Sequence, residues 1–466
     1  MAAPVGTRSC HHCIARAPFV SDRSLPAIAP RQLGAYFGLL LLTLGLAEPT
    51  GLVNLPLLFW LKDGLHMKPE SIAVFEAAAL APGYFVFVFG FMRDRWKPFG
   101  GSDRGYFILT APLAIAVYCL LPMTNMSWSL LLIGMLALVI AFESLGATTE
   151  ALMTTAAQRL VMPGRLSAVS ELGEMLPSVA SMLIGGWLAI HAGLRVTLLL
   201  GATLTLFLLV QSLAAPPIVF ASRLATEREG NGQALRRLVR HPGLWPVLAI
   251  LLVWNFSPGW GTPLLFFLSD RVKLSPEVFG AVRAAWFASS ALAAFVYAFM
   301  CRRWPLRRTL FWSVALNILP GFLILLAHTG AEAIGAAVVI GMLLGVGNIA
   351  LFDLLRRACP TDLEGSGTML GYSVFAIGGA AGDLVGAFLY ERVGFTMCLV
   401  IDAVTTAAIL PVVIMLPRHL VSWRDGERIV IESDQPPIDA DEPVRVPLLL
   451  PAQPRDAKTP RVPTPV

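Results

Sequence analysis

The sequence predicts an all-α membrane protein with about twelve transmembrane helices, arranged as two pseudo-symmetric six-helix bundles. Of its 466 residues, 56% are hydrophobic and only 14% are charged, whereas soluble globular proteins carry roughly 25% charged residues. Long apolar runs follow one another along the chain, and most reach the roughly 20 residues that a helix needs to cross a bilayer. Part of the first half also recurs in the second half, which indicates a duplicated architecture.

The internal repeat needs no gap when Pro56 is aligned with Pro263. PLLFWLKDGLHMKPESIAVFEAAA then lies over PLLFFLSDRVKLSPEVFGAVRAAW. At the same offset Glu48-Pro49-Thr50-Gly51 lies over Asn255-Phe256-Ser257-Pro258. Both first apolar runs are therefore interrupted at corresponding places by a polar residue beside a helix-breaking one. Corresponding interruptions in the two halves of a membrane protein point to a binding site near the midplane.

Six apolar runs form the predicted N-terminal bundle over residues 34–215, and six more form the C-terminal bundle over residues 244–417. The first set is Gly34–Trp60, Ser71–Met92, Tyr106–Leu121, Ser127–Ala157, Arg165–Ile190 and Gly193–Ala214. The second set is Leu244–Leu268, Phe279–Met300, Thr309–Ala327, Ala333–Leu355, Gly365–Tyr390 and Gly394–Leu416. Helices rather than a β-barrel are predicted because the runs are continuously apolar and do not alternate.

Three polar segments flank the two bundles. Residues 1–33 form a predicted cytoplasmic tail without a signal-peptide cleavage pattern, so we expect the mature chain to retain them. Residues 216–243 form a predicted cytoplasmic connector with a basic amphipathic stretch. Residues 418–466 are rich in proline, acids and arginine, and we expect a disordered cytoplasmic tail.

The distribution of basic residues predicts the orientation. Counted from an N-terminus inside, the inner loops carry clusters such as Arg93–Lys97, Arg236–Arg240 and Arg302–Arg308, whereas the outer loops hold few lysines or arginines. The excess of basic residues inside places both termini in the cytoplasm. We therefore predict a multi-pass integral protein of the plasma or inner membrane, embedded in the bilayer as a monomer.

Several classes of function are not expected. The sequence contains no phosphate loop, metal-ligand spacing or nucleophile–base arrangement, so we expect neither an enzyme nor a cofactor. Nucleic acid is not an expected partner, because no basic patch stands apart from the membrane-flanking positions. Cys10-His11-His12-Cys13 offers four possible metal ligands, but no second pair follows. We favour a flexible tail over a metal site there.

Polar side chains inside the apolar runs are the candidate functional residues, because each is costly to bury unless it is paired, protonated or hydrated. The predicted substrate- or proton-binding residues are Glu48, Asn54, Glu76, Glu143, Glu150, Glu174, Asn255, Arg283, Asn348 and Asp353. Glu48 and Glu143 lie near mid-span and are the strongest candidates. Glu174 belongs to a polar stripe at helical spacing with Ser170, Glu171, Ser178 and Ser181.

Some of these residues have a structural alternative. Glu150, Glu171 and Asp353 lie near predicted cytoplasmic ends and could instead pair with nearby arginines. Glu76 and Arg283 occupy the same repeat position with opposite charges, close enough to the outer surface to be merely solvated. Gly378, Gly382 and Gly386 recur every four residues, which favours close helix packing over ligand contact.

Three features distinguish Glu48: its depth in the bilayer, its place at the interruption that the repeat duplicates, and its carboxyl group. It lies near 20 Å along the first run at 1.5 Å per residue, close to the bilayer centre for a tilted helix. Pro49 removes a backbone hydrogen bond beside it. No lysine or arginine occupies the central part of the first, fourth, seventh or tenth run. We therefore predict Glu48 as the proton carrier, Glu143 as the second choice, and Asn255 as the neutral counterpart in the repeat.

The loop after the second run resembles a known signature. Gly90-Phe91-Met92-Arg93-Asp94-Arg95 resembles the cytoplasmic motif of the major facilitator superfamily between its second and third helices. The longer stretch GFMRDRWKPFGGSDRGYFIL is similar to the corresponding loop of the folate–biopterin transporter family. The matching residues are Gly90, Asp94, Pro98, Phe99, Gly100, Arg104 and Tyr106, and the departures are Asp103 and Gly105.

The resemblance implies the major facilitator fold, with helices one, four, seven and ten around a central cavity. It also implies that Gly90, Asp94, Arg95 and Arg104 are gating residues at the cytoplasmic side, with Asp94 meeting a neighbouring helix end. Glu48, Glu143, Asn255 and Asn348 lie on those four helices, so the implied cavity agrees with the candidates chosen from the sequence.

We therefore predict a secondary active transporter, a symporter that moves a small organic solute by alternating access with protons as the coupling ion. A pterin- or folate-like molecule or another organic anion is the expected substrate class. The alternative is a membrane assembly or scaffold protein that has the same fold and does not transport. The acid-rich core favours the transporter, because a scaffold gains nothing from unpaired carboxylates inside the membrane.

Overall fold

The structure is a computed structural model that describes residues 30–67, 69–100, 102–215, 219–220, 231–274 and 276–427. The predicted tails up to residue 29 and from residue 428, the Cys10–Cys13 cluster and residues 216–218 and 221–230 of the predicted connector lie outside these residues. Nine helical segments of the described residues are long and apolar enough to cross a membrane. Three further predicted runs are broken into shorter helices, so the number of spans stays a prediction.

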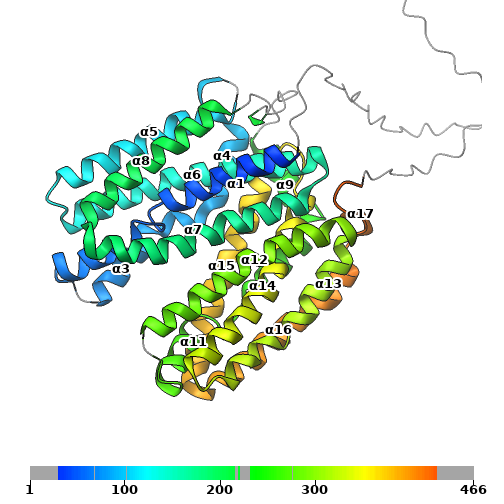
Figure 1. Cartoon of the computed structure of the whole chain (residues 1–466). Coiled ribbons are helices and arrows are strands. Elements are labelled where there is room, and N and C mark those ends of the chain that lie inside the picture. The colour runs from blue at the N-terminus through cyan, green and yellow to red at the C-terminus, as the bar shows by residue number, and fades with distance from the viewer. Residues whose placement is uncertain are drawn as a thin grey trace, which may run out of the picture. The chain divides into compact units, whose positions relative to one another are not determined.

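The helices fall into two groups that follow the two halves of the chain (Figure 1). The first group consists of α1 (Pro30–Ala47), α2 (Asn54–Phe59), α3 (Pro69–Ala79), α4 (Val86–Arg95), α5 (Arg104–Leu120), α6 (Trp128–Leu160), α7 (Pro163–His191) and α8 (Gly193–Ala214). The second consists of α10 (Leu244–Asn255), α11 (Thr262–Phe266), α12 (Pro276–Arg303), α13 (Leu306–Asn317), α14 (Gly330–Ala358), α15 (Glu364–Val393) and α16 (Phe395–Met415). The short helices α9 (Asn231–Val239) and α17 (Arg418–Val421) precede and follow the second group.

The two groups meet along a few helices. Helices α4 and α6 of the first group pack on α15, and α7 packs on α12 and α14. Within the first group α7 packs on α1, and within the second group α15 packs on α10. The interface between the halves is therefore built from corresponding helices of each.

The predicted interruptions are present in both halves. Helix α1 ends at Ala47 and α2 begins at Asn54, while α10 ends at Asn255 and α11 begins at Thr262. Pro49 cannot donate a backbone hydrogen bond, which ends the regular pattern of α1. The Tyr118 hydroxyl donates to the Ala47 carbonyl oxygen at 2.6 Å, so the break leaves this buried carbonyl hydrogen-bonded.

The repeat specifies the same local backbone twice. Five residues form one turn of π-helix at Trp60–Gly64 in the first half and at Phe267–Arg271 in the second, at the offset of the sequence repeat. His66 and Lys273, also related by that offset, both have a positive φ, of 52° and 58°. A left-handed residue ends the helix and turns the chain toward α3 or α12.

The second predicted run, Ser71–Met92, is not continuous. It consists of α3, a 3₁₀ segment at Ala81–Phe85 and α4. Pro82 lies at the start of this segment, where its ring removes a helical hydrogen bond. The sequence analysis did not predict this break, although Pro82-Gly83 is a helix-breaking pair.

The glycine series of α15 packs closely on another helix, as its spacing predicted. A methyl group at Gly378 would lie 2.5 Å from the Leu252 carbonyl oxygen, and one at Gly386 would lie 2.0 Å from the Pro258 carbonyl oxygen. Only glycine lets α15 pass so near the backbone of α10 and its interruption.

Candidate functional site

The main cavity lies between the two halves and is acidic. It has a volume of about 410 Å³ and is lined chiefly by α1, α6 and α7, with Met369, Tyr372 and Ala376 from α15. Four carboxylates of the predicted site line it: Glu48, Glu143, Glu150 and Glu174. Residues that are far apart in the sequence are thus brought to one space, as expected for a ligand site between helices.

Glu48 faces this cavity from the interruption after α1. It accepts a hydrogen bond from the Thr50 hydroxyl at 2.6 Å, and Gly51 donates its N–H to the Glu48 carbonyl oxygen at 2.9 Å. Close contact of α1 with α7 positions the break, because a methyl group at Gly45 would lie 2.8 Å from the Pro177 ring. The carboxylate thus lies on a short turn held against α7.

Glu143 and Glu174 face the same cavity from α6 and α7. Neither side chain has a hydrogen-bond or ion-pair partner among the residues that the structure describes. Glu143 lies beside Gly83, where a methyl group would come within 3.1 Å of its oxygen. Carboxylates held together without a cation need to be neutralised by protons or by a bound cationic or hydrogen-bond-donating ligand.

Glu150 differs from these three because it is paired. Its oxygens accept from the Arg356 guanidinium and from the Ser170 hydroxyl, both at 2.6 Å. Arg356 also donates to the Ser167 hydroxyl at 2.5 Å. The ion pair is deeply buried, with side chains 1% and 10% exposed. It joins the two halves, since Glu150 belongs to α6 and Arg356 to α14.

Two other buried acids also have polar partners. Glu171 accepts from the Ser290 hydroxyl at 2.6 Å, which connects α7 to α12. Asp353 pairs with Arg357 at 2.6 Å and accepts from the Tyr297 hydroxyl at 2.7 Å. Asp353 therefore has an arginine partner, as the alternative interpretation of this residue, ion pairing rather than ligand binding, predicted.

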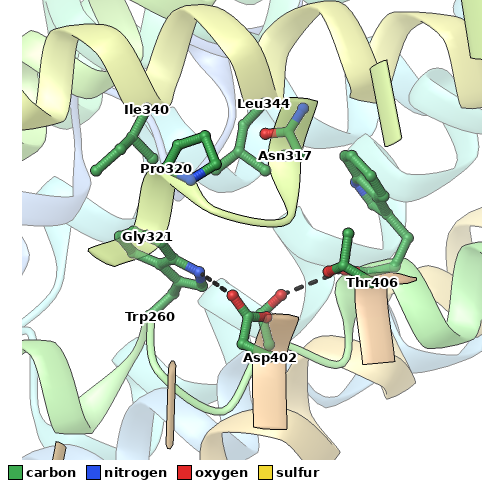
Figure 2. Close-up of a pocket in the computed structure, with 10 residues that line it drawn as sticks. Trp260, Asn317, Pro320, Gly321, Ile340, Leu344, Asp402 and Thr406 are labelled. Carbon is green, nitrogen blue, oxygen red and sulfur yellow. Dashed lines mark hydrogen bonds between the residues drawn. The ribbon is translucent and has the colours of Figure 1, made fainter. Parts of the chain in front are cut away.

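A second, much smaller cavity lies within the second half (Figure 2). Its volume of about 10 Å³ is that of roughly one water molecule. Trp260 donates its indole N–H to Asp402 of α16 at 2.9 Å, and Asn317 lies on the opposite wall. The sequence analysis did not select Asp402, although an acid within the predicted run Gly394–Leu416 was a signal that could have found it.

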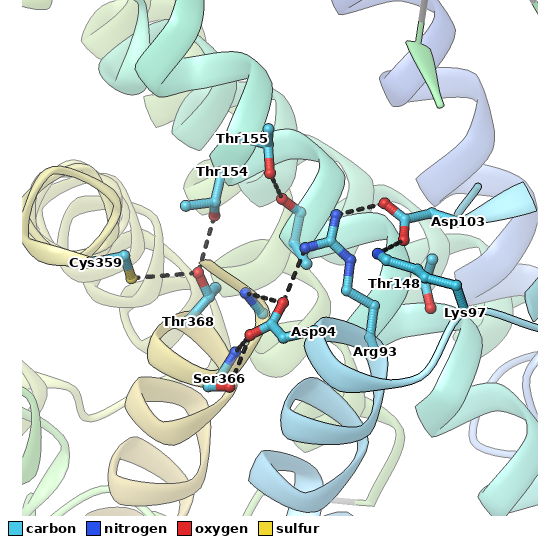
Figure 3. Close-up of polar contacts among 12 residues, drawn as sticks. Arg93, Asp94, Lys97, Asp103, Thr148, Thr154, Thr155, Cys359, Ser366 and Thr368 are labelled. Atoms are coloured by element: carbon cyan, nitrogen blue, oxygen red, sulfur yellow. Dashed lines mark hydrogen bonds and ion pairs between the residues drawn. The ribbon is translucent and has the colours of Figure 1, made fainter. Parts of the chain in front are cut away.

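The last turns of α4 meet the start of α15 (Figure 3). Asp94 accepts from the backbone N–H groups of Gly365 and Ser366, at 3.1 and 2.6 Å, and from the Ser366 hydroxyl at 2.7 Å. A carboxylate at a helix N-terminus satisfies free N–H groups and complements the helix dipole. A methyl group at Gly90 would lie 2.3 Å from the Gly365 carbonyl oxygen, so α4 and α15 are in backbone contact here.

A buried charge network supports Asp94. Arg93 pairs with Asp94 at 3.0 Å and with Asp103 at 2.5 Å, and Lys97 also pairs with Asp103 (Figure 3). Burial and the neighbouring Arg93 guanidinium lower the pKa of Lys97, against the opposite effect of Asp103. Asp103 stands where the sequence departs from the resembled family, and here it pairs with both Arg93 and Lys97.

Two of the predicted gating residues make other contacts. Arg104 donates to the Ala215 carbonyl oxygen at 2.6 Å and lies over the Phe220 ring. The Arg95 guanidinium lies 5.9 Å from the Phe91 ring centroid. Both residues thus lie at the end of the first half that carries the basic loops.

The remaining predicted site residues lie outside the lining of the main cavity. Asn255 donates to the Phe375 carbonyl oxygen at 2.7 Å, and Asn348 accepts from the Trp254 indole at 2.8 Å. Asn54 begins α2. Glu76 is half-buried in α3, and Arg283 lies 5.3 Å from the Phe287 ring centroid in α12. The structure thus groups four of the acidic candidates around the main cavity and leaves Glu76, Asp353 and the amide and arginine candidates outside its lining.

The sequence model of the Major Facilitator Superfamily matches residues 41–382, which is most of the chain. The chain belongs to this superfamily. It is therefore a membrane transporter for a small molecule rather than an enzyme, and its all-helical fold is that of the superfamily.

Individual proteins resemble the chain at low sequence identity. The chain is 23% identical over 401 residues to the folate-biopterin transporter of Synechocystis sp., and the aligned region covers 79% of this chain and 78% of the relative. Its fold is similar to that of the human organic anion transporter MFSD10, with a TM-score of 0.57 and 17% sequence identity. The match covers 83% of this chain and 100% of MFSD10. The fold is also similar to that of a bacterial homologue of the iron transporter ferroportin in an outward-facing state, with a TM-score of 0.62 and 18% sequence identity. This match covers 82% of this chain and 99% of the ferroportin homologue.

The close contact at Gly90 leads to a first prediction. Gly90→Ala places a methyl group against the Gly365 carbonyl, and such overpacking costs about 1–3 kcal/mol. The backbone cannot yield locally, so α4 and α15 should separate more readily. We expect Cys359, which is 5% exposed at this interface, to react with a maleimide roughly tenfold faster.

The measurement uses purified protein in which Cys359 is the only cysteine. Gly186→Ala is the matched control, because a methyl group there meets nothing within 4 Å and the labelling rate should not change. Equal rates for Gly90→Ala and Gly186→Ala would show that the Gly90 contact does not hold this face closed.

Proposed function

We propose that the protein is a proton-coupled carrier for a pterin-type heterocycle or a related small organic solute. The observation that supports this most directly is the shared cavity of Glu48, Glu143 and Glu174, which lacks a cation among the described residues beyond the one paired with Glu150. Such carboxylates can take up protons from one side of a membrane and release them on the other.

The chemistry of the cavity also favours this class of substrate. A pterin carries neighbouring ring and amino N–H donors, and two parallel N–H groups match the two oxygens of one carboxylate. Tyr372 supplies an aromatic wall on which a flat ring can stack. The folate-biopterin transporter of Synechocystis sp. is a relative whose name fits this choice.

Alternating access in this proposal is a rocking of two bundles, residues 34–215 and 244–417, joined by the connector 216–243. The contacts of Asp94 with α15 and of Glu150 with Arg356 close the end that carries the basic loops. The proposal places both termini in the cytoplasm, which makes this the cytoplasmic end and the described conformation outward-facing. Transport requires these contacts to break while contacts form at the other end.

The test is uptake into proteoliposomes under an imposed pH gradient, acid outside. We expect biopterin to accumulate and a protonophore to abolish the accumulation. An organic anion without paired N–H donors, such as lactate, is the control and should not accumulate. Biopterin uptake that ignores the pH gradient would exclude proton coupling, and no flux of any candidate solute would favour the scaffold alternative.

A further inference from the structure

The chain after the last membrane span returns to the interface between the halves. Asp425, four residues beyond α17, accepts from the backbone N–H groups of Gly164 and Arg165 at 3.1 and 2.9 Å. The next residue, Gly426, donates its N–H to the Val161 carbonyl oxygen at 2.7 Å. This segment from the end of the second half is therefore bound to the first turn of α7 in the first half.

The same segment is also bound to the second half. The Asp425 N–H donates to the Cys301 carbonyl oxygen at 3.1 Å. Arg357 donates to the Trp423 carbonyl oxygen at 2.9 Å, and its guanidinium lies 3.8 Å from the Trp423 ring centroid. Residues Trp423–Gly426 thus bridge α12 and α14 on one side to α7 on the other.

The repeat explains why a bridge is needed at this place. The offset that aligns the two halves brings Asp94 onto Cys301, so the second half lacks the carboxylate with which the first half caps α15. Asp94 accepts from the second and third residues of α15, Gly365 and Ser366. Asp425 accepts from the second and third residues of α7, and its oxygen lies 3.7 Å from the Cys301 sulfur.

The surrounding packing follows the same correspondence. A methyl group at Gly365 would lie 2.8 Å from the Gly90 carbonyl oxygen, and one at Gly164 would lie 2.8 Å from Cys301 Cβ. In both places glycine lets a helix start directly against the crossing helix of the other half. A carboxylate then caps that start, from the crossing helix in one case and from the C-terminal segment in the other.

We propose that Asp425 is the second gate carboxylate of this transporter, and that Trp423–Gly426 form a latch that holds the cytoplasmic face closed. The proposal rests on the alternating access proposed above. When α7 and α12 separate, Asp425 has to leave the N–H groups of α7 while Arg357 and Trp423 keep the segment on the second half. The position of this segment relative to α7 therefore depends on whether α7 and α12 are in contact or separated.

The charge of Asp425 depends on the contacts of the latch. Burial and the nearby Asp353 raise the pKa of the Asp425 carboxyl, while the N–H group of Arg165 and the Arg357 guanidinium lower it. Its side chain is fully enclosed, so release from α7 removes the donors that favour the anion. A change at Asp425 should therefore alter the stability of the closed state and leave the membrane spans in place.

The experiment measures opening directly and needs no substrate. In the full-length protein with Cys359 as its only cysteine and serine at position 301, we would measure the rate of maleimide labelling at Cys359. Asp425→Ala removes charge-assisted hydrogen bonds to α7, and labelling is expected to be about tenfold faster. Asp425→Asn keeps one acceptor and should give a smaller increase. Glu427→Gln changes an exposed neighbour whose ion-pair partner among the described residues is Arg424, so it is the matched control and should label at the starting rate.

Rescue tests the correspondence with Asp94. Asp at position 301, introduced as Cys301→Asp, should return the labelling rate of Asp425→Ala to within about twofold of the starting value. In the presence of the native Asp425 the same change places two carboxylates together and should speed labelling. A merely structural role of Asp425 would not produce this reversal of sign.

Each result decides a separate point. Unchanged labelling of folded Asp425→Ala protein, checked by size exclusion and thermal melting, would overturn the latch. Faster labelling that Cys301→Asp cannot reverse would overturn its equivalence to Asp94. Failure of biopterin uptake with these labelling differences intact would reject the substrate proposal and leave the latch standing.

Discussion

Glu48→Gln is expected to reduce accumulation of the transported solute under a pH gradient to the level of protein-free liposomes. Glutamine keeps the shape of the side chain and its ability to accept from the Thr50 hydroxyl, but it cannot carry a proton. Binding of substrate and counterflow exchange do not require net proton movement, so both should persist. The two activities should therefore separate in this variant.

The assays are pH-driven uptake and counterflow in the same proteoliposome preparation. Glu391→Gln, an exposed glutamate near the end of α15, is the control and should behave as the unmodified protein. If the Glu48→Gln protein still concentrates solute, Glu48 is a structural residue. Glu143→Gln and Glu174→Gln would then be the next variants, since these carboxylates share the cavity.

Arg356→Met is expected to have the largest effect on stability. It leaves Glu150 in a buried interface without its cation, and breaking a buried pair from one side costs about 3–5 kcal/mol. Met has a similar length and no charge, so the loss should come from the stranded carboxylate rather than from a large cavity. We expect a clear fall in the midpoint of thermal unfolding and reduced yield from the membrane.

The double variant Glu150→Gln/Arg356→Met separates charge from packing. It removes both charges, and well-packed neutral replacements of a buried pair are often tolerated. Its melting midpoint should recover most of the loss seen with Arg356→Met. A double variant as unstable as the single one would mean that the hydrogen bond of Arg356 to the Ser167 hydroxyl, rather than the ion pair, holds the halves together.

The unpaired and the paired carboxylates are thus proposed to have different roles in this protein. In the proposed mechanism the unpaired carboxylates of the cavity bind protons and ligand, while the paired ones stabilise one conformation of the two halves. The distinction between Glu150 and Glu143, seven residues apart on α6, depends on Arg356. That arginine is 206 positions away from Glu150 in the chain.

The sequence by itself determined the features that depend on local chemistry. The length and apolarity of the runs predicted membrane-spanning helices, because a bilayer sets the number of apolar residues that a span needs. The repeat predicted a duplicated fold, and the structure shows matching π-helical turns at Trp60–Gly64 and Phe267–Arg271. The breaks after Ala47 and Asn255 were also readable, because proline and adjacent polar residues end helices locally.

Only the tertiary structure decided which polar groups are paired. Arg356 meets Glu150 and Asp425 meets α7 across the interface between the halves, and neither contact follows from spacing along the chain. Cys301 at the position equivalent to Asp94 indicated only that a carboxylate was missing there. That a residue 124 positions later supplies it is a result of packing, because the free N–H groups at the start of α7 can donate to any carboxylate that the fold brings within reach.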